Sequence, residues 1–315
     1  MNFENKKATR QSYGEALAEL GRENKDVVVL DADLAGATKT NIFAKEFPER
    51  FFDMGIAEQD MMATAAGFAT CNKIPFASTF AVFATGRVYD QIRNSICYPN
   101  LNVKICATHA GITVGEDGAT HQMLEDINLM RGLPNMTVIS PSDDTQSKWA
   151  VKEAAKIKGP VYIRFGRAAT PVIYDESTKF ELGKAIQFGE GKRATIFATG
   201  MMVAEALKAK EELEKEGINI RVIDIHTIKP IDKEIIIKSA KETEKLISIE
   251  EHSVIGGLGT AISEVLTDKY PAKLIRLGMK DCFGKSGNAQ ALLKYFGLTS
   301  KEIIDCLLYT SPSPR

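Results

Sequence analysis

The stretch of sequence that decides the fold runs from residue 51 to residue 70 and reads FFDMGIAEQDMMATAAGFAT. Its first five residues, 51–55, predict a short strand, and residues 58–70, rich in alanine and methionine, predict a helix. Glu58 then stands at the head of a helix just beyond a strand end, where open α/β sheets bind ligands. The small side chains of this helix would let another surface approach closely, as at a subunit interface. A plainer interpretation is that Glu58 only favours the positive helix terminus.

The same alternation of strand and helix continues on both sides of this stretch. In the first half we expect strands at 27–31, 75–80, 103–108, 136–140 and 161–165, with helices at 11–22, 87–95 and 145–156. Residues 174–191 are polar and irregular, as in a linker. In the second half we expect strands at 194–198, 219–224, 245–250 and 272–277, with helices at 203–216, 233–242 and 259–268.

This order of elements predicts an α/β protein with two doubly wound domains, residues 1–173 and residues 192–307. The last residues, 308–315, alternate serine with proline, which cannot continue a helix. We expect these residues to form a disordered or foreign tail.

The composition is that of a soluble globular protein. Of the 315 residues, 44% are hydrophobic and 26% are charged, and the formal net charge is −1. This balance favours neither nucleic acid nor an anionic membrane as a partner. The apolar runs are too short to span a bilayer, and the first residues do not form a secretory signal, so we expect a cytoplasmic protein. The five scattered cysteines lack metal-ligand spacing, which favours reduced structural thiols.

A loop with two histidines directly follows the predicted strand 103–108. Residues 108–122 read THAGITVGEDGATHQ and include His109, Asp117 and His121. Imidazoles, acids and backbone amides freed by glycine could bind hydroxyls or a phosphate and move protons. A metal site lacks support from any recognised ligand spacing. The plainer alternative is a structural glycine turn with solvated histidines.

Two further segments carry side chains that suit a flat or an anionic ligand. Phe80 and Phe83 could form an apolar wall for a heterocycle, although such phenylalanines are more often core residues. Arg164 and Arg167 end a predicted buried strand, and a guanidinium suits bidentate phosphate binding. A surface ion pair would also explain these arginines. The glycine-rich turn at 255–259 lacks the full spacing of a dinucleotide loop and predicts a strand-to-helix turn.

In this order, the motifs resemble those of one enzyme family. They are DADL at 31–34, GIAE at 55–58, STF at 78–80, GEDGATHQ at 115–122, PSD at 141–143 and EEH at 250–252. Together they resemble the C-terminal half of transketolase, a thiamine diphosphate enzyme, over about residues 8–307. The resemblance implies a pyrimidine-binding domain followed by a transketolase C-terminal domain. It also implies transfer of a two-carbon ketol unit between sugar phosphates, as in pentose phosphate metabolism.

The resemblance assigns residues to the cofactor. Glu58 matches the glutamate that hydrogen-bonds the aminopyrimidine of thiamine diphosphate and promotes its imino tautomer, which makes Glu58 a catalytic residue. Burial would suit proton sharing there, because it raises the pKa of a carboxyl group. Phe83 matches the residue that stacks on the pyrimidine, Phe80 helps to line that pocket, and Asp33 matches an acid near the thiamine.

It assigns others to the substrate. His109 and His121 match histidines that contact the substrate and count as catalytic, and Asp117 matches an acid that recognises a sugar hydroxyl. Arg10 and Arg167 match the arginines that bind the sugar phosphate. His226 and His252 are expected to be structural.

Two departures from the family pattern shape the expected function. Gly86 stands where the full-length enzymes carry a further aromatic residue, so part of the pyrimidine wall must differ. The stretch 86–91 is also similar to deoxyxylulose-phosphate synthase, which uses pyruvate, so that enzyme is an alternative. The β subunit of two-subunit 2-oxo acid dehydrogenases shares the fold, but the two-histidine loop fits sugar phosphates better.

The Gly-Asp-Gly motif with which the family binds metal and diphosphate is absent. No metal ligand is therefore expected in this chain. Mg²⁺ or Ca²⁺ is expected from a partner, an N-terminal transketolase subunit, in an α2β2 assembly with the cofactor bridging the chains. A non-catalytic protein that regulates or binds a partner is the alternative of another class; the presence of Glu58, Phe83, His109 and His121 together argues against it.

Overall fold

The computed structural model describes residues 3–309, and its first domain is built on a seven-stranded sheet. The strand order is β12-β6-β7-β5-β4-β2-β3, and every neighbouring pair except β12 with β6 is parallel. The six parallel strands are β2 (Val27–Asp31), β3 (Phe51–Asp53), β4 (Ile74–Phe80), β5 (Lys104–Thr108), β6 (Thr137–Ile139) and β7 (Val161–Arg164). Each of them lies where the apolar runs predict a strand.

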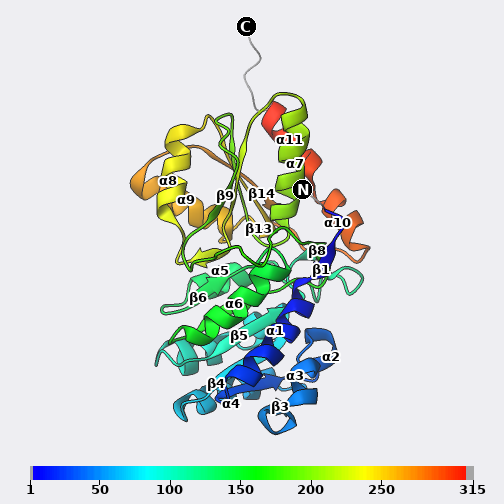
Figure 1. The fold of residues 1–315 in the computed structure, drawn as a ribbon, viewed down its shortest axis with the longest axis vertical. Helices are drawn as coiled ribbons and strands as arrows, with labels where there is room; N and C mark the ends of the chain where they lie inside the picture. Colours follow the sequence, from blue (N-terminus) through cyan, green and yellow to red (C-terminus); the bar gives the residue numbers. More distant parts are fainter. Residues whose placement is uncertain (1–2, 310–315) are drawn as a thin grey trace.

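Helices cover both faces of this sheet (Figure 1). On one face lie α1 (Thr9–Glu23), α3 (Asn41–Glu46) and α6 (Asp144–Lys156), whose apolar residues share one buried cluster. On the other lie α4 (Glu58–Thr70) and α5 (Asp126–Arg131), in a second cluster. Shorter segments are α2 (Ala35–Thr38), η1 (Pro48–Arg50) and η4 (Ile112–Val114). Instead of one helix at 87–95, the chain forms two π-helical segments, η2 (Phe83–Arg87) and η3 (Gln91–Cys97).

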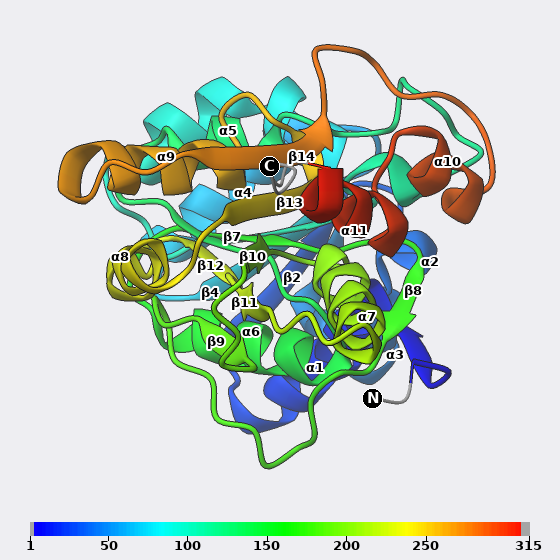
Figure 2. The ribbon, with the colours of Figure 1, turned by 90° about the horizontal axis from the view of Figure 1, so that it is seen from above.

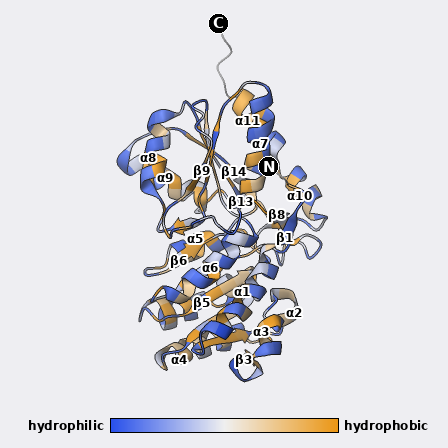
Figure 3. Cartoon of the chain, viewed as in Figure 1, coloured by the Kyte–Doolittle hydropathy of each residue, from blue (hydrophilic) through white to orange (hydrophobic). Residues whose placement is uncertain are grey.

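The second domain is built on a five-stranded sheet in the order β14-β13-β10-β11-β9. Its strands are β9 (Ile186–Phe188), β10 (Thr195–Ala198), β11 (Arg221–Asp224), β13 (Leu246–Ser253) and β14 (Leu274–Met279). The helices are α7 (Met202–Lys215), α8 (Lys233–Glu242), α9 (Leu258–Lys269), α10 (Ala289–Tyr295) and α11 (Ser300–Tyr309). Viewed from above, α8 and α7 lie on opposite sides of this domain (Figure 2). Apolar colours follow the strands and polar colours the outward side of helices such as α8 (Figure 3).

Three features of the chain differ from the expected organisation. The strand β9 lies within residues 174–191, which are expected from their composition to be irregular. Its residues are only half-buried at a sheet edge, so they do not form the apolar run that predicts a buried strand. The strand β12 (Thr227–Lys229) leaves the second domain and pairs antiparallel with β6 of the first. Helix α11 continues through Tyr309, so the tail predicted from residue 308 cannot begin there; residues 310–315 lie outside the described part.

A short antiparallel ladder joins the beginning of the chain to the end of the first domain. It pairs β1 (Lys6–Ala8) with β8 (Ala169–Pro171) and holds the start of α1 beside the end of β7. Two α/β domains with mainly parallel sheets and helices on both faces are thus the observed fold, and the expected fold class is confirmed. Among residues 3–309, no helix is both long enough and apolar enough to cross a membrane.

Candidate functional site

Most of the side chains expected at the site follow the carboxyl ends of parallel strands, while Arg10 lies in the first turn of α1. Asp33 follows β2, Glu58 follows β3, Phe83 follows β4, His109 follows β5 and Arg167 follows β7. Because parallel strands end at the same edge of the sheet, these segments gather along that edge, beside the strand β2 at which the chain reverses its winding direction. The carboxyl edge of the first sheet is therefore the candidate site.

Glu58 lies at the first turn of α4 with its carboxylate buried, only 3% exposed. Both of its oxygens accept hydrogen bonds from Nη1 of Arg87, at 3.0 and 2.9 Å. The guanidinium carbon of Arg87 also lies 4.4 Å from the centre of the Phe83 ring. A flat donor group thus occupies the space between a carboxylate and an aromatic face.

The position of the Arg87 guanidinium indicates which flat groups Glu58 and Phe83 could bind, including the aminopyrimidine of a thiamine cofactor. An aminopyrimidine is, like a guanidinium, a flat group with N–H donors and a face that can stack on a phenyl ring. The Arg87 side chain shows that Glu58 and Phe83 can engage such a group together. The residues present therefore fit the pyrimidine end of the cofactor. Gly86 is exposed, and a Cβ there would meet no atom within 4 Å, so the expected gap in the aromatic wall is open space.

The loop of residues 109–122, here called the histidine loop, stacks on the same aromatic wall. The rings of Phe80 and Phe83 lie 6.1 Å apart and nearly parallel. The His109 ring stacks on Phe80 with centres 3.8 Å apart, and the His121 ring meets Phe83 edge-on at 5.7 Å. The two histidines and the two phenylalanines thus form one continuous surface.

His109 is held as a neutral imidazole. Burial, with the positive charges of Arg10 and Arg167 next in effect, lowers its pKa to about 3. Its Nδ1 lies 2.9 Å from Oγ1 of Thr108, and its Nε2 lies 3.5 Å from Nη1 of Arg10. Its backbone is in the left-handed region, with φ +59°. A neutral ring held in this way suits hydrogen bonding to an oxygen of a ligand more than permanent positive charge.

Positive charge gathers beside His109. Arg10 donates to the carbonyl oxygen of Ala37 at 2.8 Å, and burial followed by the neighbouring Arg167 lowers the pKa of Arg10. Arg167 donates to the carbonyl oxygen of Val114 at 2.7 Å and to Oε2 of Glu116 at 2.9 Å. The structure therefore brings together the two arginines expected to bind phosphate. An anion with several oxygens would be the natural ligand of this cluster.

The two remaining predicted acids are less enclosed. Asp33 is exposed with φ +60°, and its backbone N–H donates to Oδ1 of Asp53 at 3.1 Å. The same oxygen accepts from the backbone of Gly55 at 2.9 Å, so Asp53 ties together the loops after β2 and β3. Asp117 is exposed on the histidine loop.

Three charged residues of this region were not predicted from the sequence. Arg87 pairs with Glu58. It lies in the stretch 86–91, which is similar to deoxyxylulose-phosphate synthase, but that similarity does not predict the pairing. Lys39 stands at the end of α2 with φ +74°, close enough for its charge to lower the pKa of His109. Glu251 belongs to one of the family motifs, and its Oε1 accepts from the backbone N–H of Thr113 at 2.5 Å, a role that the motif alone does not reveal.

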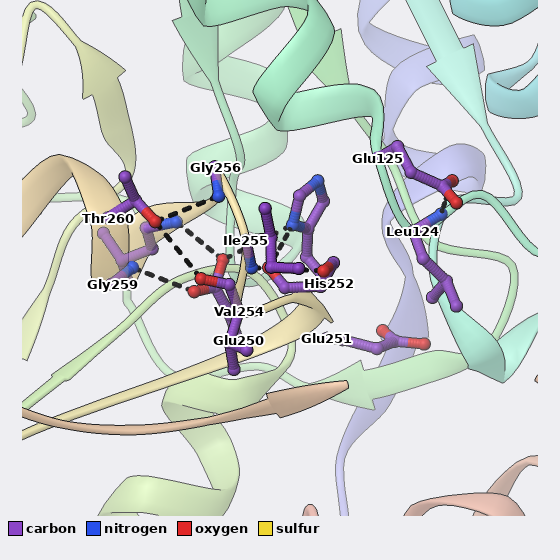
Figure 4. A network of polar contacts seen from close by, with 12 residues as sticks. Leu124, Glu125, Glu250, Glu251, His252, Val254, Ile255, Gly256, Gly259 and Thr260 are labelled. Atoms are coloured by element: carbon purple, nitrogen blue, oxygen red, sulfur yellow. Dashed lines mark hydrogen bonds and ion pairs between the residues drawn. The ribbon is translucent and has the colours of Figure 1, made fainter. Parts of the chain in front are cut away.

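The glycine-rich turn at 255–259 binds a side chain of the same domain, the carboxylate of Glu250. Both oxygens of Glu250 accept hydrogen bonds at the start of α9, from Leu258 at 2.6 Å and from Gly259 at 2.9 Å (Figure 4). The neighbouring His252 is buried, and burial lowers its pKa to about 4. Burial likewise lowers the pKa of His226 to about 4, and its Nε2 lies 3.2 Å from the carbonyl oxygen of Glu181.

No group of three or more His, Cys, Asp or Glu side chains within residues 3–309 is arranged to hold a metal ion. The site as described thus consists of a buried carboxylate, an aromatic wall, a neutral imidazole and a cationic cluster at one edge of the sheet.

Comparison with known proteins accounts for almost the whole chain. Residues 5–172 match the transketolase pyrimidine-binding domain, and residues 183–303 match the transketolase C-terminal domain. The chain is 53% identical to a candidate transketolase C-terminal section of Methanocaldococcus jannaschii, covering 94% of both chains. It is 44% identical to a 6-deoxy-6-sulfo-D-fructose transketolase subunit of Clostridium sp. strain MSTE9, covering 94% of this chain and 92% of the relative.

Human transketolase is 39% identical over 92% of this chain, which spans only 47% of the human protein. A solved structure described as a split gene transketolase, inactive β4 tetramer, has a TM-score of 0.89 and 54% identity, covering 96% of this chain and 97% of that one. The resemblance is confirmed: the chain belongs to the transketolase family of thiamine diphosphate enzymes, and its relatives include a transketolase subunit and a split gene transketolase.

Proposed function

We propose that this chain is the pyrimidine-binding subunit of a two-chain transketolase that moves a two-carbon ketol unit between sugar phosphates. The observation that carries the proposal is one sheet edge at which Glu58 and Phe83 together engage a flat donor group beside His109 and the arginine cluster. One end of this edge suits the cofactor, and the other suits a phosphorylated sugar. The chain would work in the cytoplasm.

At the cofactor end, bound thiamine diphosphate would supply the carbanion chemistry of ketol transfer. The part of this chain is to hold the aminopyrimidine and to share a proton with it through the Glu58 carboxylate. Phe80 and Phe83 exclude water from one face of the ring, which strengthens that hydrogen bond because the local dielectric is low. Asp33 matches an acid that lies near the thiamine in the family pattern.

At the substrate end, the neutral His109 can donate or accept a hydrogen bond at a sugar oxygen without carrying charge. His121 and Asp117 would contact the sugar from the same loop. Arg10 and Arg167 would bind the terminal phosphate, and the nearby Lys39 would add a third positive charge. Together these side chains would hold a polyol phosphate with its reacting carbon toward the cofactor.

We further infer that the chain is active only beside an N-terminal transketolase subunit, in an α2β2 assembly. The chain spans about half the length of full-length transketolases such as the human one. The homologous β4 tetramer is described as inactive. The partner would supply the Mg²⁺ or Ca²⁺ ion and the residues that hold the diphosphate.

The anionic group of the sugar is the least fixed feature of the substrate. The relative from Clostridium is described as acting on a sulfonated fructose. Phosphate and sulfonate both present several oxygens to a guanidinium, so the arginine cluster fits either. A third positive charge at Lys39 favours the phosphate, because a phosphate monoester carries up to two negative charges and a sulfonate carries one.

The proposal is tested by mixing this chain with a candidate N-terminal half in the presence of thiamine diphosphate and Mg²⁺. Ketol transfer from xylulose 5-phosphate to ribose 5-phosphate is expected in the mixture and not with either chain alone. Turnover only with pyruvate and glyceraldehyde 3-phosphate would instead identify a deoxyxylulose-phosphate synthase. If Glu58→Ala left the activity of the mixture intact, the chain would be a non-catalytic partner.

A further inference from the structure

The histidine loop belongs to the first domain in sequence, but its far side is buried in the second domain. Ile112 of the loop is fully buried in the same apolar cluster as residues of α7, β10 and β13, and Leu124, just after the loop and 3% exposed, lies in that cluster too. The loop is therefore shared between the two cores. Any movement of the second domain would be transmitted to His109 and His121.

Glu251, from β13 of the second domain, makes the central polar contact with this loop. Its side chain is buried, and its Oε1 accepts from the backbone N–H of Thr113 at 2.5 Å. Gly111 makes room for the carboxylate, because a Cβ at Gly111 would overlap the carboxyl carbon of Glu251. The backbone of Gly111 also has φ +81°, which disfavours a larger residue. The loop is thus shaped to receive this carboxylate.

Other contacts fix the second half of the loop to the segment before α10. Nε2 of Gln122 donates to the carbonyl oxygen of Lys285 at 2.8 Å and to that of Ile112 at 3.0 Å. Oγ of Ser286 donates to the carbonyl oxygen of Glu116 at 2.6 Å. The histidine loop is therefore held by the second domain both near His109 and near His121.

The contact at Thr113 lies next to one of the phosphate-binding arginines. The residue after Thr113 is Val114, whose carbonyl oxygen accepts from Nη1 of Arg167 at 2.7 Å. The chain of contacts Glu251–Thr113–Val114–Arg167 links the second domain to the cationic cluster. Releasing Thr113 would loosen Val114 and leave Arg167 with only its second partner, Oε2 of Glu116.

We propose that Glu251 is a positioning residue of the sugar phosphate site, and that the C-terminal domain sets the geometry of that site through it. Glu251 touches neither the surface formed by Glu58 and Phe83, here called the cofactor face, nor the cationic cluster. It acts through the backbone of the histidine loop. This inference rests on the proposed function. It gives the C-terminal domain a part in substrate binding.

The neighbouring residue supplies a matched control. Glu250 and Glu251 are adjacent on β13, both are buried, and both accept hydrogen bonds from backbone N–H groups. They point to different sides, as Figure 4 shows: Glu250 toward the start of α9, and Glu251 away from it. Replacing either glutamate removes a buried carboxylate, but only the loss of Glu251 should free the histidine loop.

The test compares Glu251→Ala, Glu250→Ala and Glu251→Gln by amide hydrogen exchange on the chain and by steady-state kinetics with the partner subunit. In Glu251→Ala, exchange of the Thr113 amide should be at least about tenfold faster, as expected for loss of a buried hydrogen bond. The KM for the phosphorylated sugar should rise about tenfold, while the dissociation constant of thiamine diphosphate changes less than about twofold. Glu251→Gln retains an acceptor oxygen and should recover most of both losses.

In Glu250→Ala, exchange should quicken at Leu258 and Gly259 and not in the histidine loop. The proposal is overturned if both alanine variants speed exchange in the loop equally, or if Glu251→Ala weakens cofactor binding as much as substrate binding. If Glu251→Ala does not fold, Gly111→Ala displaces the same carboxylate from the loop side and must give the same pattern. Absence of ketol transfer by the unmodified complex would reject the proposed function, while the exchange contrast would still decide whether Glu251 anchors the loop.

Discussion

The cofactor face and the histidine loop meet at one sheet edge, yet different parts of the chain hold them. Glu58 lies in α4, and Phe83 and Arg87 lie in η2, so their contacts are made within the first domain. The histidine loop is fixed by Glu251, Lys285 and Ser286 of the second domain. Cofactor binding should therefore depend on one domain, and substrate binding on the way two domains fit together.

The largest effect is expected from changing the cofactor face. Glu58→Gln keeps the shape of the side chain but cannot accept a proton, so ketol transfer in the reconstituted complex should fall about 100- to 10,000-fold. Asp60→Asn, an exposed change in the same helical turn, is the control and should keep full activity. Initial rates with xylulose 5-phosphate and ribose 5-phosphate measure both. A loss of less than about tenfold in Glu58→Gln would contradict the cofactor assignment.

The next effect concerns the stability of the second domain. Burial raises the pKa of Glu250 to about 7, above the ordinary value of 4.5. Between these values the unfolded chain releases a proton that the folded chain keeps, so the folded state loses stability as pH rises from 4.5 to 7. Glu250→Gln removes this titration. Its free energy of unfolding, relative to that of the unmodified chain, should therefore increase by up to about 3 kcal/mol over this range. Urea unfolding at several pH values measures it; a constant difference between the two proteins would argue against the raised pKa.

A smaller effect is expected at Arg87, which occupies the space between Glu58 and Phe83. On the proposed assignment of Glu58, a bound cofactor would displace this guanidinium from the carboxylate. Because Arg87 is partly exposed, the ion pair contributes only about 1 kcal/mol. Arg87→Ala should therefore bind thiamine diphosphate a few-fold more tightly in calorimetric titrations of the complex, and Arg93→Ala should bind unchanged. Weaker binding by Arg87→Ala would mean that the guanidinium also contacts the bound cofactor.

The smallest effect is expected at Gly86, beside the same face. A Cβ at this position meets no atom within 4 Å, and the residue lies in a helical segment. Gly86→Ala should raise the free energy of unfolding by about 0.4–1 kcal/mol, because the unfolded chain loses conformational freedom. Thermal unfolding of the two proteins tests this. A lower free energy of unfolding in Gly86→Ala would show that the folded chain does not tolerate a side chain in the open space beside Phe83.

The features that could be predicted from the sequence are those set by residues close to one another in the chain. Strand ends place Glu58, His109 and Arg167, and a parallel sheet brings strand ends to one edge, so the sequence alone is enough to group these residues. The helix from Glu58 to Thr70 has the expected bounds, since its run of alanine and methionine is unbroken by proline. Such features depend on neighbours in the sequence.

The features that were not predicted depend on partners far away in the chain. Glu251 meets Thr113 across 138 residues, and Arg87 meets Glu58 across 29. The three-residue strand β9 is recognisable only by its partner β11, and β12 only by its pairing with β6 of the other domain. Neither hydrophobic periodicity nor motif spacing reports such pairs.

The pairing of β12 with β6 has a consequence for dissecting the molecule. A fragment ending at residue 173 would lack β12 and would present β6 as an open sheet edge, with unpaired backbone groups ready to recruit another chain. Such a fragment would be prone to self-association during refolding, however well its own core is formed. The folding of the two domains is therefore linked, and a fragment made to isolate the first domain should extend at least through Lys229.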